Sequence, residues 1–188
     1  MSIRSAPVVG GGDADLWYAL QVRSNFEKVT AAHLQSRGFA PLLPLYRSRR
    51  TWSDRLKTID LPLFPGYLFC SFDINKRLPV LSTPGVVKVV GAGNRPIPVH
   101  LDQIKALHAI GEAGCPAEPW PYLEAGQRVR IERGVLCGIE GVLIEIRKVH
   151  RIVVSVTLLQ RSVSVEIDRD WVVPVKSALS LAVGKSAC

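Results

Sequence analysis

A proline and a glycine interrupt an apolar stretch at residues 63–69, which reads Leu-Phe-Pro-Gly-Tyr-Leu-Phe. Pro65 fixes its own φ and lacks an amide donor, whereas Gly66 supplies backbone torsions that other residues resist. We therefore expect a sharp turn that leads into a buried strand. Such a turn would place Phe64 and Tyr67 at the corner of a sheet.

The large apolar side chains of this stretch have two interpretations. Phe64, Tyr67 and Phe69 belong to the protein's own core, with Phe69 the most deeply buried, because large apolar residues usually lie inside. Alternatively, they form an exposed patch onto which a partner docks. The local sequence leaves both interpretations open.

The composition is that of an ordinary globular protein. The chain has 188 residues, of which 47% are hydrophobic and 21% charged, so it is neither disordered nor collagen-like. No apolar run approaches the roughly 20 residues that a membrane helix needs. Residues 1–15 lack the continuous apolar segment of a secretory signal. We therefore expect a cytoplasmic protein without a membrane contact.

The net charge of +8 belongs to the N-terminal half. Residues 16–110 contain 13 Lys and Arg against 5 Asp and Glu, a net of +8, whereas residues 123–175 contain 8 against 7, a net of +1. This asymmetry predicts a polyanion near the first half and a protein surface near the second. The alternative is a mildly basic domain without such a partner.

The first half begins with a strand and a helix. Residues 16–22 have the aromatic and aliphatic content of a buried strand. Ser24 and Glu27 fit a capping box, and Gly38 stands where a helix would end. The expected apolar stripe of this helix consists of Phe26, Val29, Ala32 and Leu34.

More strands and a second helix complete this half. The expected strands are residues 39–46, 66–72 and 86–90, and the expected helix is residues 101–110. The polar segment 47–57, with a turn at 52–54, would join its neighbours as a hairpin arm. This order predicts an α/β sandwich in which helices pack against a mainly antiparallel sheet.

Residues 111–122 contain two glycines and three prolines, a composition that resists both helix and sheet and predicts a linker. Beyond it, short β-branched segments without a helical stretch predict a small closed barrel. Its expected strands are residues 127–131, 141–147, 151–159, 163–167 and 171–175. The predicted fold class is α+β, with an α/β sandwich over residues 16–110, an all-β barrel over 123–175, and flexible tails at 1–15 and 176–188.

No constellation of residues predicts an enzyme. The four histidines show no ligand spacing, and the chain lacks a nucleophile elbow and a phosphate-binding loop. Its cysteines are too scattered for a zinc site or a disulfide framework. These cysteines are Cys70, Cys115, Cys137 and Cys188. We expect no catalytic residue, no metal and no cofactor.

The densest basic cluster consists of Arg47, Arg49, Arg50, Arg55 and Lys57. On a projecting hairpin these charges would lie along a phosphate backbone, in a contact that salt weakens and that depends little on sequence. A solvated hairpin tip is the alternative.

A second pattern spans residues 126–143. Val129 and Ile131 face the same side of a strand, and the glycines at 134, 138 and 141 permit two tight turns. Together with the corner at residues 63–69, this pattern resembles the NusG family of transcription elongation factors over about 160 residues, from 16 to 175. The matches are Trp17-Tyr18, Phe26-Glu27-Lys28, residues 62–69, residues 82–86 and a KOW glycine pattern at 126–143.

The resemblance implies an NGN domain that binds the clamp coiled coil of the largest RNA polymerase subunit. It also implies a KOW barrel that recruits a ribosomal protein or the termination factor Rho. The protein would be a monomer that stabilises the closed clamp and so modulates pausing, termination or antitermination. The basic hairpin would face upstream or non-template DNA.

Matched positions imply two binding surfaces. The polymerase-docking surface would consist of Phe64, Pro65, Tyr67 and Val89. The KOW partner surface would consist of Leu136, Ile139, Leu158, Leu159 and Arg161. Several of these KOW positions are often Phe in general NusG proteins and are aliphatic here. This departure argues against Rho as the partner of the barrel.

Two alternatives accompany the resemblance. An operon-specific paralogue of RfaH type is similar in its arm and corner, but Lys76-Arg77-Leu78 replaces the His-Thr-Thr element. Residues 152–157 also favour strand over the helical hairpin that RfaH can form. The second alternative comes from another class: a KOW-containing ribosomal or RNA-binding protein, in which the barrel would contact RNA. The near-neutral charge of the barrel argues against this alternative.

Overall fold

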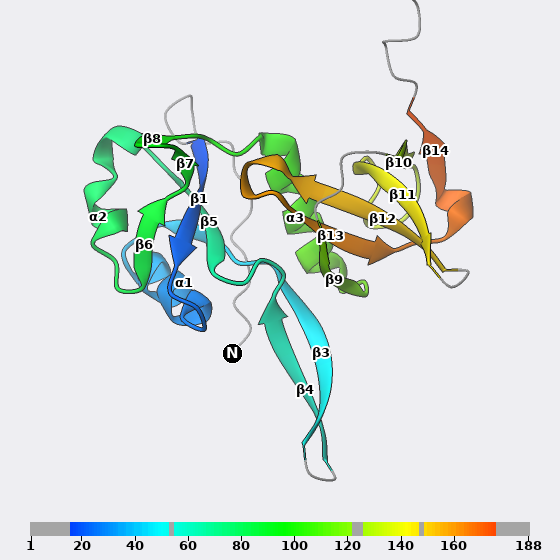
Figure 1. Ribbon diagram of the computed structural model, residues 1–188, viewed down its shortest axis with the longest axis horizontal. Coiled ribbons are helices and arrows are strands. Elements are labelled where there is room, and N and C mark those ends of the chain that lie inside the picture. Colours follow the sequence, from blue (N-terminus) through cyan, green and yellow to red (C-terminus); the bar gives the residue numbers. More distant parts are fainter. Residues whose placement is uncertain (1–15, 53–54, 122–125, 147–148, 176–188) are drawn as a thin grey trace, which may run out of the picture.

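The computed structural model of the chain describes residues 16–52, 55–121, 126–146 and 149–175. The N-terminal half packs helices against a four-stranded antiparallel sheet, and the C-terminal half is a small barrel built from a six-stranded antiparallel sheet (Figure 1). The predicted α+β class is confirmed. The tails expected at 1–15 and 176–188 lie outside the described residues.

The N-terminal sheet has the strand order β2-β5-β1-β6. Its strands are β1 (Leu16–Val22), β2 (Ala40–Leu42), β5 (Tyr67–Phe72) and β6 (Val86–Val89). Alternate residues of β1 face opposite sides, so Tyr18 and Leu20 enter one apolar cluster while Ala19 enters another. The predicted strands at 16–22, 66–72 and 86–90 are confirmed to within a residue, whereas 39–46 divides between β2 and a separate hairpin strand.

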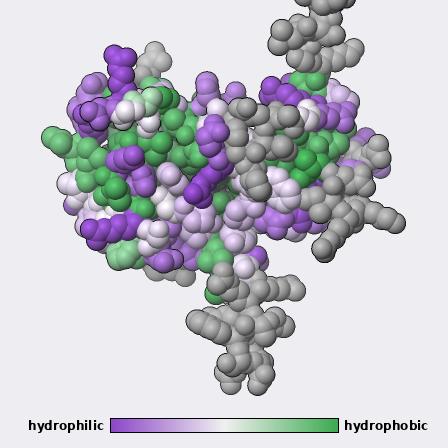
Figure 2. All heavy atoms as spheres, viewed as in Figure 1, coloured by the Kyte–Doolittle hydropathy of each residue, from purple (hydrophilic) through white to green (hydrophobic). Residues whose placement is uncertain are grey.

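One face of this sheet is covered by α1 (Glu27–Ser36) and α2 (Leu78–Leu81). The buried residues of α1 are Glu27, Thr30, Ala31 and Leu34. The predicted apolar stripe is therefore wrong except at Leu34, because Phe26 and Val29 are about half exposed and Ala32 is exposed. Thr30 and Ala31, which are both small, lie on the buried face and let the helix approach the sheet closely. Figure 2 shows hydrophobic residues at the surface on the left of the view, where α1 and α2 lie in Figure 1.

The predicted capping box is also wrong. Phe26 occupies the N-cap position, and no side chain caps the helix there. Glu27 is instead buried, and its Oε1 accepts a hydrogen bond of 2.8 Å from the backbone N–H of Gly66. A residue that the local pattern assigned to its own helix thus holds the corner of the sheet.

A two-stranded hairpin, β3 (Leu45–Trp52) and β4 (Arg55–Pro62), projects away from the body of the molecule (Figure 1). The predicted hairpin arm is confirmed, although two residues of its turn, 53–54, lie outside the described residues. A second, very short hairpin joins β7 (Gly91–Ala92) to β8 (Arg95–Pro96).

The other face of the N-terminal sheet packs towards α3 (Leu101–Ala113). This helix runs three residues further than predicted and ends on Gly114, whose φ of +62° is the left-handed C-cap that favours glycine. Among the described residues, no helix is long and apolar enough to span a membrane.

The C-terminal barrel has the strand order β14-β10-β11-β12-β13-β9. Its elements are β9 (Ala117–Pro121), β10 (Gln127–Ile131), β11 (Glu140–Ile146), β12 (Val149–Val156), η2 (Thr157–Leu159), β13 (Arg161–Glu166), η3 (Arg169–Trp171) and β14 (Val172–Pro174). The five predicted strands are present with boundaries shifted by a few residues. The sixth, β9, comes from the segment predicted to be a linker, and that part of the prediction is wrong. Prolines fit this strand because it lies at the edge of the sheet.

Candidate functional site

The corner at residues 64–67 is a tight turn. The N–H of Tyr67 donates to the carbonyl of Phe64 at 3.0 Å, and Gly66 has a φ of +82°. Proline in the second position and glycine with positive φ in the third are the features of a type II turn. The turn predicted from the sequence is confirmed, and it aims the chain directly into β5.

A second proline-glycine turn, at residues 83–86, leads into β6 in the same way. The N–H of Val86 donates to Thr83 O at 3.1 Å, and Gly85 has a φ of +94°. Helix α1 holds both turns, because Glu27 accepts from Gly66 N–H and Thr30 Oγ1 donates to Pro84 O at 3.3 Å. The corner is therefore a rigid part of the fold.

The rings of the corner differ in exposure. Phe64 and Phe69 are buried and meet edge to face, with ring centroids 5.6 Å apart. The burial predicted for Phe69 is confirmed, whereas Phe64 is 1% exposed and forms no part of an exposed patch in this conformation. Pro65 is exposed and Tyr67 is half-buried. Val89 packs in the cluster beneath α1 and is not brought together with Phe64 and Tyr67.

Tyr67 contacts the C-terminal barrel. The guanidinium carbon of Arg161, at the start of β13, lies 5.3 Å from the centroid of the Tyr67 ring. This distance is within the range of a cation–π interaction. One residue of the predicted polymerase surface thus contacts one residue of the predicted KOW partner surface.

Phe64 of the predicted polymerase surface and four positions of the predicted KOW partner surface share one apolar cluster. Phe64 and Leu107, from the N-terminal half, belong to it together with barrel residues. Those barrel residues include the predicted partner positions Leu136, Ile139 and Leu159, with Leu158 packed against the cluster. Only Arg161 among the five is exposed. The structure therefore buries three of the five KOW positions in the cluster that also contains Phe64, and it leaves Leu158 half-buried against that cluster.

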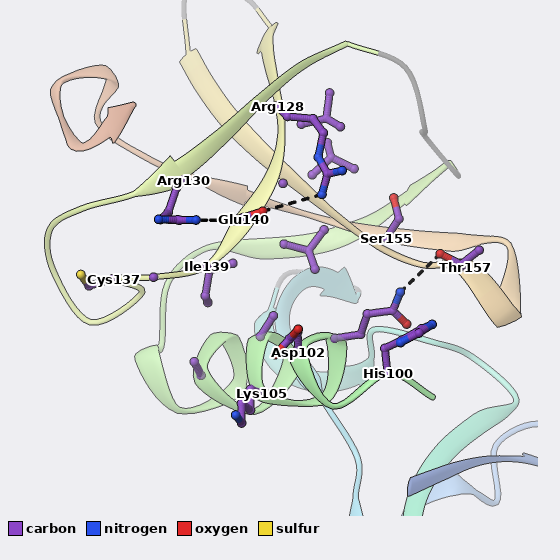
Figure 3. A pocket seen from close by; sticks show the side chains of 18 residues that line it. His100, Asp102, Lys105, Arg128, Arg130, Cys137, Ile139, Glu140, Ser155 and Thr157 are labelled. Carbon is purple, nitrogen blue, oxygen red and sulfur yellow. Dashed lines mark hydrogen bonds and ion pairs between the residues drawn. The ribbon is translucent and has the colours of Figure 1, made fainter. Parts of the chain in front are cut away.

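The contact between α3 and the barrel is incomplete. Gln103 Nε2 on α3 donates to Thr157 Oγ1 at 3.3 Å, and beside this bond lies an open cleft of about 970 Å³ (Figure 3). On the barrel side of the cleft, Glu140 pairs with both Arg130, at 2.9 Å from Nε, and Arg128, at 3.7 Å. Because the cleft interrupts the interface, opening exposes less buried surface than the separation of a continuous apolar core would.

The basic hairpin places its charges at defined register positions. In the backbone register of the two strands, Arg47 lies opposite Asp60, Arg49 opposite Thr58 and Arg50 opposite Lys57. The Arg47 side chain is exposed. Arg55 pairs with Trp52. The backbone of the arm is described, but the side chains of residues 49–57 lie outside the described residues.

The structure describes three of the cysteines, which differ in exposure. Burial raises the pKa of the Cys70 thiol to about 12, and Cys115 is half-buried, whereas Cys137 is exposed. Within the described ranges, no three His, Cys, Asp or Glu side chains come together as metal ligands.

Sequence reasoning missed Gln103, Thr157 and the strand β9. The first two look like any polar surface residue, and nothing local marks them. For β9 a signal existed, because Pro119 and Pro121 alternate at a spacing of two, which suits an edge strand as well as a linker.

Comparison with known proteins places this geometry in a family. Residues 15–108, half of the chain, match the family model described as transcription termination factor NusG. The chain is 29% identical over 179 residues to the transcription termination/antitermination protein NusG of Thermus thermophilus, covering 84% of this chain and 97% of that protein. With NusG of Escherichia coli K12 it shares 25% identity over 166 residues, covering 81% and 92%.

A solved structure has the same fold. The structure titled "Domain interaction in Thermotoga maritima NusG" superposes with a TM-score of 0.54 at 21% identity, covering 86% of this chain and 98% of that one. With the family model matched over the strands and turns that form the corner, the chain belongs to the NusG family of transcription termination and antitermination factors.

Proposed function

We propose that this protein docks on the clamp of RNA polymerase through the corner at residues 64–67 and recruits a second protein through the barrel. Membership of the NusG family supports the docking role, and the rigid corner with its half-buried tyrosine supplies a suitable anchor. The second protein is a ribosomal protein or Rho, bound through the barrel positions Leu136, Ile139, Leu158, Leu159 and Arg161.

The conformation of the chain is then a closed form. The observation that carries this proposal is the Arg161 guanidinium over the Tyr67 ring, which joins the two predicted surfaces. A protein cannot use a surface for a partner while the same surface is covered from within. Polymerase and the barrel's partner therefore each favour the open form, and by linkage each raises the affinity for the other.

In the open form the protein acts without making or breaking a covalent bond. Bound across the polymerase cleft, it shifts the population of the clamp towards its closed state. Its net effect on elongation or termination depends on the protein that the barrel recruits.

Truncation of the anchor tests the docking site. We expect Tyr67→Ala to retain the fold and to weaken binding to core polymerase by about thirtyfold, since a buried aromatic anchor contributes about 2 kcal/mol on truncation. Binding is measured by titration of labelled polymerase. Tyr67→Phe, which keeps the ring, is the matched control and should bind nearly as the parent does. Unchanged affinity for the alanine variant would show that the corner is not the docking site.

The basic hairpin is proposed to face upstream or non-template DNA. Replacing Arg49 and Arg50 by Gln should weaken binding to the elongation complex and make that binding less dependent on salt, because each lost phosphate contact lowers the salt slope. Lys28→Gln with Lys88→Gln is the control, since it removes two positive charges from exposed positions of α1 and β6. An equal change of salt slope in both double variants would show that the hairpin has no special role.

A further inference from the structure

Strand β9 joins the two halves of the chain in a way that a free linker would not. Only Gly114, Cys115 and Pro116 separate the end of α3 from the first residue of β9. β9 then pairs with β13 in a continuous antiparallel register from Ala117↔Val165 to Pro121↔Arg161, and it also approaches β3 of the hairpin (Figure 1). The barrel is therefore fastened close to α3.

The register determines which residues of β9 hold it. The N–H of Glu166 donates to Pro116 O at 3.3 Å, and on the other side of β13 the N–H of Ile167 donates to His150 O at 3.0 Å. Because bonded pairs recur at every second residue of an antiparallel ladder, Glu118 and Trp120 fall on positions bonded to β13. Pro119 and Pro121 fall between them, where a missing N–H costs no ladder bond.

A side-chain ion pair reinforces the strand at one of these bonded positions. Arg151 on β12, with 19% of its side chain exposed, pairs with the carboxylate of Glu118. The same guanidinium donates to Ser164 Oγ at 3.2 Å and lies 3.9 Å from Glu166. Among the described residues, β9 is thus held by alternate backbone bonds to β13, by the ion pair of Glu118 and by the packing of Ala117 against the apolar cluster.

We propose that β9 is a detachable strap that holds the barrel against the corner. While β9 is paired, the tether between α3 and the barrel sheet is three residues long and spans roughly 10 Å. Once β9 leaves β13, the tether runs from residue 114 to residue 126, just before β10, which lengthens its reach to roughly 44 Å. Movement of the barrel away from the corner, which separates Arg161 from Tyr67, therefore favours release of β9. The inference rests on the proposed function only for the consequence that opening exposes the docking corner.

The test uses the full chain without polymerase, so its failure is distinct from failure of the docking proposal. Glu118→Pro removes a ladder donor and the ion pair together. We expect amide hydrogen exchange at Glu166 to accelerate by about tenfold or more, as loss of one hydrogen bond and one partly exposed ion pair implies. In the parent, we expect ¹⁵N relaxation to give β11 and β12 the same rotational correlation time as β1 and β5, because the two halves tumble together. In Glu118→Pro, the two pairs of strands should have different correlation times, because the barrel tumbles separately.

Ala117→Pro is the matched control, since it adds a proline one residue away at a position that donates no ladder bond. It should leave both measurements at the parent values. Acceleration at Glu166 while the barrel keeps the shared correlation time, or no acceleration at all, would overturn the proposal.

A second variant covers the case in which Glu118→Pro unfolds the barrel, recognised by lost protection in β11 and β12. Eight Gly and Ser residues inserted after Gly114 lengthen the tether and leave β9 unchanged. The strap predicts that this insertion alone releases the barrel, with Glu166 still protected. A shared correlation time in the insertion variant would show that the short tether does not hold the two halves together.

Discussion

Both faces of the N-terminal sheet carry buried apolar residues, but the two faces are covered by different means. Tyr18, Leu20 and Leu68 point to the face beneath α1 and α2, where the cover comes from the same half of the chain. Ala19, Phe69 and Tyr67 point to the face beneath α3, where the apolar cluster continues into the C-terminal barrel. One face is closed by its own domain, and the other is closed partly by a neighbour.

This difference shows that a low exposed fraction does not by itself assign a side chain to the core of its own domain. Phe64, at 1% exposed, and Leu20, at 0%, look alike by exposure. Only the origin of the surrounding atoms distinguishes a residue that stabilises the fold in every state from a residue near a surface that a partner could take over. Variants on each face should therefore differ in whether they change the stability of the fold or the contact between its halves.

The largest effect is expected on the self-contained face. Leu20→Ala removes a fully buried side chain from the central strand and should lower the free energy of unfolding by about 2–5 kcal/mol. Urea denaturation of the full chain measures this change. Leu78→Ala, at a position that is 75% exposed, should alter it by less than about 0.5 kcal/mol. Equal effects of the two variants would contradict the assignment of Leu20 to a core.

A smaller loss is expected where α1 holds the corner. Glu27→Ala leaves the N–H of Gly66 without its acceptor and should lower the free energy of unfolding by about 1–3 kcal/mol. Thermal unfolding followed by circular dichroism reports it. Glu27→Gln retains a side-chain carbonyl and should recover most of the loss. If the glutamine variant were as unstable as the alanine variant, the hydrogen bond to Gly66 would not be the cause.

On the shared face, a change in the contact should alter binding rather than folding. Arg161→Gln removes the cation over Tyr67, which contributes about 0.5–1 kcal/mol to the closed form. Affinity for polymerase should therefore rise by about two- to fivefold, the opposite sign to Tyr67→Ala. Arg128→Gln, an equal charge loss on the same barrel facing Glu140, is the control. A fall in affinity for Arg161→Gln would mean that the arginine itself contacts polymerase.

A last prediction, on the self-contained face, concerns pH. Burial on the self-contained face raises the pKa of the Cys70 thiol to about 12, above its value of about 8.5 in an unfolded chain. The stability due to the protonated thiol is thus fully present below about pH 8.5 and is lost as pH rises towards 12. Between pH 8 and 10, the free energy of unfolding should fall more steeply for the parent than for Cys70→Ala. Identical slopes would indicate that solvent reaches the thiol.

Local chemistry in the sequence was enough for most elements of the fold. Pro65 and Gly66 favour a type II turn, because φ is fixed at proline and glycine accepts the positive φ that the third position of this turn needs. Strand periodicity identified β1 and the strands β10 to β14, and the helical spacing identified α3. The basic arm and the corner were placed from the same kind of evidence.

What the local pattern misassigned were the faces and partners of residues. Phe26 and Val29 have helical spacing for a core stripe and lie outside, because Thr30 and Ala31 allow α1 to approach the sheet more closely. Glu27 fits a capping box and instead bonds to Gly66, 39 residues away. Each error arose where a partner distant in the chain competed with a local one.

The sequence by itself determined the two proline-glycine turns, most of the strands, two of the helices and the family resemblance, since these depend on torsional limits, periodicity and motifs within a few residues. Only the tertiary structure decided that a proline-rich segment pairs as β9, that Val89 lies apart from Phe64, and that Arg161 covers Tyr67. Those outcomes depend on which apolar faces and unpaired strand edges meet across the whole chain, and that free energy is not encoded in any one segment.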